Sequence, residues 1–359
     1  MNTKLCCCAI SVSSACLAGT AFAQTTAVPI ATYTAGMSAF AESPNGSVIY
    51  AAEPSENSVA VINAATLQVV KTVPIGSDPV ALALSPDGST LYAADFGSNF
   101  IGVMNTQTLT ESTSPIPLSS GAYAFGLATG TDGRLWVLEQ TEPKGISPYG
   151  NIIQINAATG ASSGPAVYPS NYGVYSGAIV GSADGDTLYY TAYGLSPPPP
   201  LTKYDISGPS AVSGWSANGG GILALSHDGN TVVSGDQVYS AANGLVTGTL
   251  AATPTGYGSF AFSPDNSVLY GAANGYNSNF EMVGVVNVFN MQTMLETNTI
   301  WIGPTPLNLF LDNSANHLFV NLGSTTEVLA VPEPKPLLLL CACGAGFLLV
   351  HRRRLRPRS

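Results

Sequence analysis

The hydrophobic pattern of this chain repeats with a period of about 44 residues along most of its length. Each unit opens with an apolar segment, turns at a pair of Asp, Asn or Gly residues, and continues into a short strand rich in Tyr, Val and Leu. The clearest copies are Ser43–Ala52 (SPNGSVIYAA) and Ser85–Ala94 (SPDGSTLYAA). A fixed period of roughly 20–50 residues is typical of stacked or circular arrays of one supersecondary motif.

Seven such turns are present, and their residue pairs take the positive-φ positions of tight hairpins without strain. The pairs are Asn45-Gly46, Asp87-Gly88, Asp132-Gly133, Asp184-Gly185, Asp228-Gly229, Asp265-Asn266 and, in altered form, Asn313 to Asn316. Strands are expected after them at Val48–Ala51, Leu91–Ala94, Leu135–Leu138, Leu188–Ala192, Thr231–Ser234, Val268–Gly271 and Leu318–Asn321. A third strand is expected at Val59–Asn63, Ile101–Asn105, Ile152–Asn156 and Val285–Phe289, and a fourth is clearest at Gln68–Pro74. Four antiparallel strands per unit predict an all-β, seven-bladed β-propeller.

The seventh unit has no residues left for a fourth strand after Glu327–Val331. At the other end of the chain, Val28–Tyr33 alternates in hydrophobicity before the first complete unit. We therefore expect this N-terminal segment to supply the missing outer strand and close the ring, which removes a sheet edge prone to aggregation.

The first 23 residues have the composition of a secretory signal peptide. One basic residue, Lys4, precedes an apolar stretch, and Ala21-Phe22-Ala23 forms an Ala-x-Ala site before Gln24. This order predicts export and cleavage by signal peptidase after Ala23. A lipoprotein site at Cys16 is the alternative, although Ser13 stands where such a site usually has a large aliphatic residue.

The C-terminal residues 332–359 combine a short motif, an apolar segment and a basic end. Val331-Pro332-Glu333-Pro334 precedes an uncharged run over 337–350, and an Arg-rich end follows. A helix of that run would span about 21 Å, short for a hydrocarbon core of about 30 Å, so one interpretation is a marginal anchor with its arginines in the cytoplasm. The four features in this order resemble the PEP-CTERM sorting signal. That resemblance implies transient insertion in the inner membrane of a Gram-negative-type cell, processing by an exosortase, and passage to the cell surface or medium.

The repeat itself is similar to a known family. Asn57–Val70, Val73–Gly76 and Pro79–Gly88 resemble the YVTN family of β-propeller repeats, most strongly in the first two units. The strand after the turn departs from the family pattern, since it reads Leu91-Tyr92-Ala93-Ala94 in this chain. The resemblance implies the propeller fold and export, and it implies no catalytic residues.

Without its two ends, the domain of residues 24–331 is acidic and has no cysteine. All six cysteines lie in the terminal segments, so no disulfide is expected in the domain. It keeps four of the basic residues and twenty of the 21 acids, for a net charge of −16. An acidic domain argues against a nucleic-acid partner, because phosphate contacts require Lys and Arg.

Long loops on a rigid scaffold often carry function, and in this chain they carry aromatic side chains. The expected second-to-third loops of the third, fourth and sixth units are the longest, and Tyr149, Tyr276 and Phe280 lie in them. Tyr123, Tyr175 and Tyr257 precede first strands and could surround the same opening. Aromatic rings there suit sugar rings or flat protein surfaces, although loop tyrosines also simply cap sheet ends.

Catalytic motifs and metal-binding spacings are absent from the sequence of the domain, and no cofactor is expected. His227 and His317 have no evident catalytic partner, and we expect both to be structural. Seven carboxylates are expected near the opening and could bind Ca²⁺ or form a solvated acidic rim. They are Glu53, Glu56, Asp95, Glu139, Glu142, Asp236 and Glu281.

These observations favour an exported binding scaffold for polysaccharide or protein of the cell envelope or biofilm matrix. One alternative is a hydrolase of the propeller lactonase type, which would need a general base and an electrophile. Arg134 would be its electrophile, but it stands beside a turn expected on the opposite face. The other alternative is a structural surface protein without a specific ligand.

Overall fold

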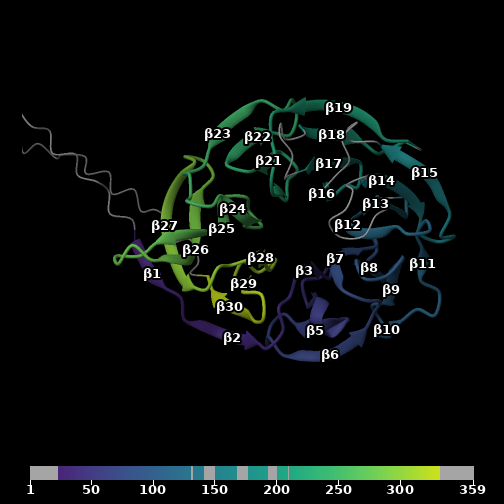
Figure 1. The fold of residues 1–359 in the computed structure, drawn as a ribbon, viewed down its shortest axis with the longest axis horizontal. Helices are drawn as coiled ribbons and strands as arrows, with labels where there is room; N and C mark the ends of the chain where they lie inside the picture. Colours follow the sequence, from purple (N-terminus) through teal and green to yellow (C-terminus); the bar gives the residue numbers. More distant parts are fainter. Residues whose placement is uncertain are drawn as a thin grey trace, which may run out of the picture.

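The computed structural model describes residues 23–130, 132–140, 150–167, 177–192, 200–208 and 210–331. Within these ranges the strands form seven sheets arranged in a ring, as Figure 1 shows. Each sheet is one blade, and its strands run antiparallel from the axis to the perimeter in the order in which the repeat supplies them. The seven-bladed all-β propeller predicted from the repeat is therefore confirmed.

In the first three blades the innermost strand comes first in the chain and the outermost comes last. The first blade contains β3 (Ala39–Glu42), β4 (Val48–Glu53), β5 (Ser58–Asn63) and β6 (Val69–Pro74). The second contains β7 (Pro79–Leu84), β8 (Thr90–Asp95), β9 (Phe100–Asn105), and an outer strand divided into β10 (Thr110–Glu111) and β11 (Ile116–Pro117). The third contains β12 (Tyr123–Thr129), β13 (Arg134–Gln140), β14 (Gly150–Asn156) and β15 (Ser162–Val167).

The remaining blades follow the same plan from axis to perimeter, except that the seventh takes its outermost strand from the N-terminus. The fourth contains β16 (Gly177–Gly181), β17 (Thr187–Ala192), β18 (Leu201–Asp205) and β19 (Val212–Ala217). The fifth contains β20 (Leu223–Leu225), β21 (Thr231–Ser234), β22 (Gln237–Ser240) and β23 (Val246–Thr249). The sixth contains β24 (Tyr257–Phe262), β25 (Val268–Tyr276), β26 (Met282–Asn290) and β27 (Leu295–Gly303). The seventh contains β28 (Asn308–Leu311), β29 (His317–Asn321), β30 (Thr326–Ala330) and β2 (Pro29–Tyr33).

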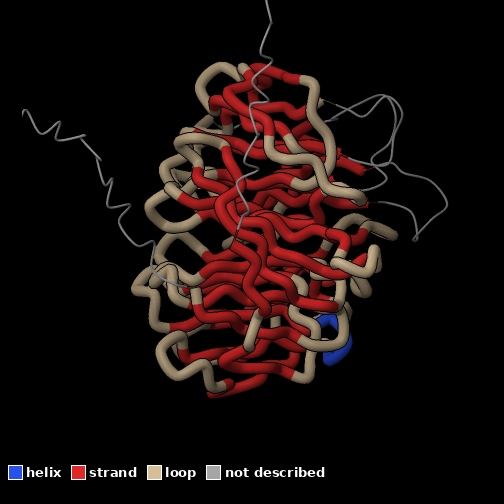
Figure 2. The backbone as a smooth tube through the Cα atoms, turned by 90° about the vertical axis from the view of Figure 1, so that its left-hand side faces the viewer, coloured by secondary structure: helices blue, strands red, loops and turns tan. Residues whose placement is uncertain are grey.

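Two loop-bearing faces follow from this topology, and Figure 2 shows the ring from its side with strands running between them. The turns between first and second strands lie on one face, which we call the corner face. The loops between second and third strands, and the connections from one blade to the next, lie on the other, which we call the mouth face. A short 3₁₀ turn, Pro54–Glu56, belongs to the mouth face and appears blue in Figure 2.

The ring is closed by the N-terminal segment, as predicted. Strand β2 pairs antiparallel with β30, with Pro29 opposite Leu329 and Tyr33 opposite Thr326. Tyr33 also donates a hydrogen bond from its hydroxyl to the carbonyl of Leu67 at 2.7 Å, which ties the closing strand to the first blade. An unexpected further strand, β1 (Ala23–Thr26), pairs parallel with β27 and makes the sixth blade five-stranded.

The corner turns are held by a Ser–Asp pair that explains the recurrent Ser-Pro-Asp-Gly sequence. Ser85 Oγ donates to Asp87 Oδ1 at 2.6 Å and accepts the N–H of Thr90 at 3.0 Å. The hydrogen bond from Ser85, with others from Ser89, lowers the pKa of the exposed Asp87 to about 2. Equivalent bonds start from Ser182, Ser226 and Ser263, and from Ser43, whose acceptor is Asn45 in place of Asp.

Only the second residue of each turn pair adopts positive φ, whereas the sequence suggested that both would. Gly88 has φ 69° and Asn266 has φ 60°. The reason is that these hairpins are longer than two residues: between β7 and β8 the loop spans residues 85–89, and Gly88 N–H donates to the Ser85 carbonyl at 2.8 Å. A longer hairpin of this kind places one residue in the left-handed region, whereas a two-residue turn places both there.

The corner of the seventh blade, which looks degenerate in sequence, keeps the same hydrogen bonds with the two side chains exchanged. Asp312 stands at the Ser position and Ser314 at the Asp position, and Ser314 Oγ donates to Asp312 Oδ2 at 2.7 Å. Asp312 Oδ1 accepts the N–H of His317 at 3.1 Å, which is the role that Ser85 Oγ plays for Thr90. His317 Nδ1 lies 2.7 Å from Asp312 Oδ2, so this histidine serves the turn.

We predict that Asp312→Ala lowers the free energy of unfolding by about 2 kcal/mol, because it leaves several turn donors without an acceptor. The exchange Asp312→Ser with Ser314→Asp restores the arrangement of the other blades and is expected to cost less than about 1 kcal/mol. Urea unfolding of the three proteins checks this. An exchange as costly as the alanine variant would show that the pair does not carry the turn.

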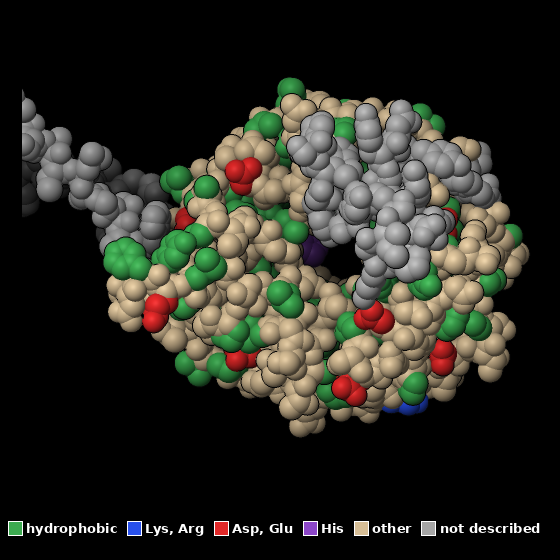
Figure 3. Space-filling model, viewed as in Figure 1, with side chains coloured by type: hydrophobic (Ala, Val, Ile, Leu, Met, Phe, Trp, Pro, Cys, Tyr) green, Lys and Arg blue, Asp and Glu red, His purple; other side chains and the backbone are tan. Residues whose placement is uncertain are grey.

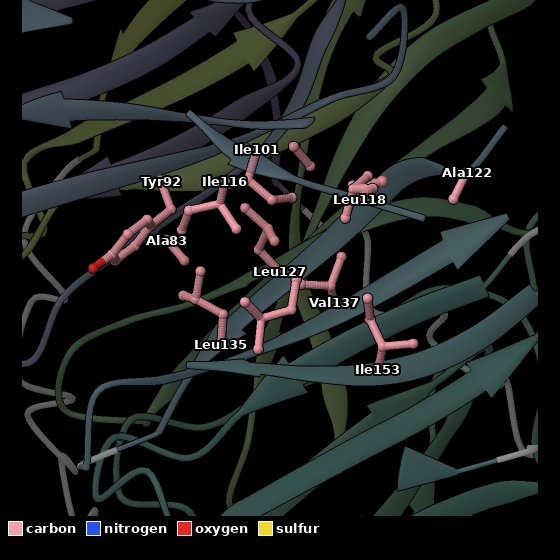
Figure 4. Close-up of a cluster of buried hydrophobic side chains, with 13 residues drawn as sticks. Ala83, Tyr92, Ile101, Ile116, Leu118, Ala122, Leu127, Leu135, Val137 and Ile153 are labelled. Atoms are coloured by element: carbon pink, nitrogen blue, oxygen red, sulfur yellow. The ribbon is translucent and has the colours of Figure 1, made fainter. Parts of the chain in front are cut away.

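The hydrophobic core is divided among the interfaces between blades. Among the described residues, seven clusters of buried side chains each join two successive blades. Figure 4 shows the cluster between the second and third blades, where Tyr92, Ile101 and Ile116 meet Leu127 and Leu135. Because each blade is buried on both sides, its stability depends on both neighbours, and the ring depends on closure.

Candidate functional site

A cavity lies on the axis of the ring, and its walls are formed by the innermost strands. The innermost strands β3, β7, β12, β16, β20, β24 and β28 each pair with one neighbour only, on the outer side. An unpaired strand edge presents backbone N–H and C=O groups, so these groups face the central channel. Figure 3 shows the mouth face with the hollow at its centre.

Near the mouth face the channel contains a cavity of about 560 Å³. Pockets of about 300–1,000 Å³ are typical of small-molecule sites. The lining comes from six blades and comprises Ser38, Ala39, Val80, Ala81, Leu82, Phe125, Gly126, Leu127, Gly177, Ala178, Ile179, Gly258, Leu307, Asn308 and Asn321. None of these residues is charged.

Three of the innermost strands contain a β-bulge at the level of the cavity. The register of β7 shifts between Pro79 and Ala81, that of β12 between Ala124 and Gly126, and that of β24 between Tyr257 and Ser259. The extra residues, Val80, Phe125 and Gly258, all line the cavity. A bulge bends its strand and redirects side chains, and bulges are common beside functional sites.

The polar side chains of the lining connect blades to one another. Asn308 Nδ2 donates to the Ser38 carbonyl at 2.7 Å, and Asn308 Oδ1 accepts from Ser259 Oγ at 2.7 Å. These bonds join the sixth, seventh and first blades where the ring closes. Ser38 Oγ in turn donates to the Pro79 carbonyl of the second blade at 3.1 Å. Asn308 is therefore fixed in position, and the cavity wall at the closure is rigid.

Of the carboxylates expected around the opening, those within the described ranges do not line this cavity. Glu53, Asp95 and Glu139 occupy the same repeat position in the first three blades, at the mouth end of the second strand, and all three are buried. Burial raises the pKa of each, opposed at Glu53 by a hydrogen bond from Ser58. Asp236 holds the equivalent position in the fifth blade and is exposed.

Asp95 is the most unusual of these acids because its side chain is fully buried, and a weak contact with the backbone of Gly102 is its main polar interaction. Gly76 and Gly102 leave the space that it occupies. A Cβ atom at Gly76 would lie 2.0 Å from Asp95 Oδ2, and one at Gly102 would lie 2.7 Å from it. Burial raises the pKa of Asp95 to about 7, opposed by the backbone of Gly102 and reinforced by Glu111.

No group of three or more His, Cys, Asp or Glu side chains among the described residues is placed to hold a metal ion. The three buried acids belong to three different blades, since they lie on β4, β8 and β13. Glu142 lies outside the described residues. The calcium interpretation therefore receives no support from the part of the chain that the structure describes.

The aromatic residues expected to form one binding surface are distributed over separate places. Tyr257 packs against Phe260 and Phe289 at centroid distances of 4.8 and 6.0 Å, and its hydroxyl donates to the Ala251 carbonyl. Tyr123 is half-buried against Phe96 at 6.1 Å. Both therefore cap sheet ends.

Tyr276 and Phe280 lie together on the hairpin between β25 and β26, with 54% and 87% of their surfaces exposed. This hairpin reaches the outer perimeter of the ring beside β1, away from the channel (Figure 1). The structure does not bring the pair together with Tyr123, which lies in the third blade. Tyr149 and Tyr175 lie outside the described residues.

Arg134 and His227, the basic residues considered for acid–base chemistry, make structural contacts on the corner face. Arg134 forms an ion pair with Asp132 and donates to the carbonyls of Gly208 and Ile206, which joins the third blade to the fourth. The backbone N–H of His227 donates to Asn266 Oδ1 at 2.7 Å, and its ring lies against the Phe262 carbonyl.

The expected processing sites lie at the limits of the described chain. Ala23 begins β1, and Ala21 precedes the described residues. Val331 is buried, and its N–H donates to the Asn316 carbonyl at 2.9 Å. Pro332, Glu333, Pro334 and the apolar run 337–350 lie outside the described residues. Within the described ranges, no helix is long and apolar enough to span a bilayer.

Sequence reasoning did not identify the residues of the cavity. The bulge residues Val80 and Phe125 carry one weak signal, since each stands in a run of apolar or small residues that breaks strict alternation in an inner strand. Asn308 and Asn321 carry none, because an Asn at a strand end is ordinary. They line the cavity only because the fold brings neighbouring blades together, as in the contact of Asn308 with Ser38.

Two kinds of sequence comparison find no match, since neither a family model nor a curated protein corresponds to this chain. Solved structures with a similar fold include Kuenenia stuttgartiensis hydrazine synthase, at 17% identity, 82% coverage of this chain, 96% of that chain and a TM-score of 0.63. Another is the β-propeller domain of Myceliophteria thermophila Cps50 (Swd1), at 12% identity, 85% coverage of this chain, 100% of that chain and a TM-score of 0.66. At these identities the similarity shows the β-propeller fold alone.

Proposed function

We propose that this chain is an exported β-propeller that acts as a binding scaffold in the cell envelope or biofilm matrix, with its mouth face as the working face. The observation that carries the proposal is the cavity at the axis, walled by strands of six blades and shaped by three bulges. A rigid concave site with convergent backbone groups is the form that ligand sites commonly take.

Export is the part of this proposal supported by the two terminal sequences. Ala21-Phe22-Ala23 fits cleavage by signal peptidase, and Val331–Pro334 with the apolar run and Arg-rich end resembles a PEP-CTERM signal read by an exosortase. The YVTN-like repeat agrees with a secreted propeller. The protein would pass through the inner membrane, be held there by its C-terminal helix, and reach the surface or medium after processing.

The ligand is proposed to be polysaccharide or protein of the envelope. The described mouth face carries the acids Glu56, Asp78, Asp236 and Glu281, while Lys71, Arg134 and Lys203 lie on strands or the corner face. An acidic surface of this kind disfavours nucleic acid and other polyanions.

The test is co-sedimentation of the protein, expressed from its full sequence, with the host's own exopolysaccharide and envelope fractions. We expect saturable binding that Phe125→Ala weakens about tenfold, a change equivalent to about 1.4 kcal/mol. Tyr276→Ala tests the exposed hairpin as an alternative contact. Val70→Ala, on the outer strand of the first blade with 58% exposure, is the matched control. Absence of binding to both fractions would contradict the proposal and leave a purely structural role.

A further inference from the structure

We infer that the cavity at the mouth end of the channel binds a neutral, polyhydroxylated ligand, a saccharide chain end or short segment. The inference rests on the proposed binding function and assigns its site and ligand chemistry. Three properties of the wall carry it: its charge, its hydrogen-bonding groups and its apolar rim.

The first property is the absence of charge among the described residues that line the cavity. A charged ligand entering it would lose hydration without gaining a counter-charge, which costs several kcal/mol or more. Anions are disfavoured further, because the described mouth face carries the acids Glu56, Asp78, Asp236 and Glu281. A cation would find no carboxylate among the lining residues. The ligand is therefore neutral.

The second property is the mixed hydrogen-bonding character of the wall. Every innermost strand turns its unpaired edge to the channel, so N–H donors and C=O acceptors converge from several directions. The side chains of Ser38, Asn308 and Asn321 also line the cavity, where their hydrogen bonds to neighbouring protein groups hold the wall in place. A sugar hydroxyl both donates and accepts, so a polyol can pair with backbone N–H and C=O groups alike, whereas a hydrocarbon can pair with neither.

The third property is an apolar rim that suits the C–H faces of a sugar ring. Phe125 and Val80 are half-buried bulge residues, and Leu307 is 54% exposed beside Asn308. Aromatic and aliphatic groups placed next to fixed polar groups give a ligand orientation as well as affinity. At about 560 Å³ the cavity admits a ligand of a few rings and excludes a folded domain.

The chain offers a variant that blocks the cavity without removing an existing contact. Gly258 lines the cavity, and a Cβ atom there would lie no closer than 3.6 Å to any neighbour. Its φ is not in the left-handed region, so a side chain is tolerated by the backbone. Gly258→Leu should therefore fill the cavity in a protein that still folds, which its melting temperature would verify.

The experiment is calorimetric titration of the full-length protein with oligosaccharides released from the host exopolysaccharide and separated into neutral and acidic pools. We expect the neutral pool to bind and the acidic pool not to bind. Gly258→Leu should abolish binding, Phe125→Ala and Leu307→Ala should each weaken it about tenfold, and Val70→Ala should leave it unchanged.

The outcomes separate this inference from the proposed function. Neutral binding that survives Gly258→Leu, or equal binding of the acidic pool, would overturn the assignment of site and ligand. Loss of all oligosaccharide binding while envelope fractions still co-sediment with the protein would leave the scaffold function standing and refute the saccharide site. If neither the oligosaccharides nor the fractions bind, both proposals fail.

Discussion

Deleting residues 24–35 from the full-length chain is expected to lower the free energy of unfolding by about 5 kcal/mol or more, a large share of the roughly 5–15 kcal/mol typical of a domain. The deletion removes β2 and exposes the third strand of the seventh blade. It also removes Tyr33, whose ring lies parallel to Phe319 at 6.3 Å and packs on the cluster between the seventh and first blades. Thermal and urea unfolding measure the loss.

The topology supplies a matched control for this deletion. Because β2 runs antiparallel to β30 and Pro29 lies opposite Leu329, the same strand can be attached after Val331 through a short Asn-Gly turn. Moving residues 28–35 to that position, before Pro332, should recover most of the lost stability. A deletion variant as stable as the parent protein would refute closure by β2. If the deletion destabilises the protein and the relocated strand does not restore stability, the loss would be due to the removal of β1.

The effect of Asp95→Asn on the free energy of unfolding is expected to depend on pH. Between pH 4 and pH 8 the variant should gain up to about 4 kcal/mol of stability relative to the parent protein. Burial raises the pKa of Asp95 from 3.8 to about 7 in the folded protein. Between about pH 4 and pH 7 the carboxyl is neutral in the folded protein and ionised in the unfolded protein, so folding takes up a proton. The parent protein therefore loses stability as the pH rises through this range. Asn carries no charge at any of these pH values.

The measurement is urea unfolding of both proteins across pH 4 to 8. Glu53 and Glu139 add a slope of the same sign, so the difference between variant and parent isolates Asp95. Asp236→Asn is the matched control, since Asp236 occupies the equivalent repeat position on the surface. A pH-independent difference for Asp95→Asn would show that its carboxyl is not buried in a neutral state.

Much of the fold could be predicted because residues close together in the sequence specify each repeat. The predicted second strands lie within β4, β8, β13, β17, β21, β25 and β29. The Ser–Asp corners depend on hydrogen bonds between residues two to five apart, as at Ser85. One short segment therefore contains all the residues that specify the turn. The closing role of Val28–Tyr33 followed from counting strands.

The corner of the seventh blade keeps the turn although its sequence no longer matches the repeat. Asp312 and Ser314 exchange the roles of donor and acceptor and so preserve it. The equivalence lies in hydrogen-bonding capacity, and only the coordinates of both side chains reveal it.

The candidate site could not be predicted, because its residues meet only when seven blades are arranged around one axis. The sequence drew attention to aromatic loop residues, yet Tyr257 is engaged in packing and Tyr276 lies on a peripheral hairpin. The cavity is instead lined by Val80, Phe125 and Asn308, which sequence patterns do not distinguish from ordinary strand residues.

The sequence by itself determined the class of fold, the number of blades, the hairpin corners and the closing strand, because these follow from hydrophobic alternation and from hydrogen bonds between near neighbours. Only the tertiary structure decided which carboxylates are buried, which strand edges face the axis, and which side chains form the cavity. Burial, desolvation and convergence depend on contacts between residues far apart in the chain. Asp95 beside Gly76 and Asn308 beside Ser38 owe their properties to those contacts.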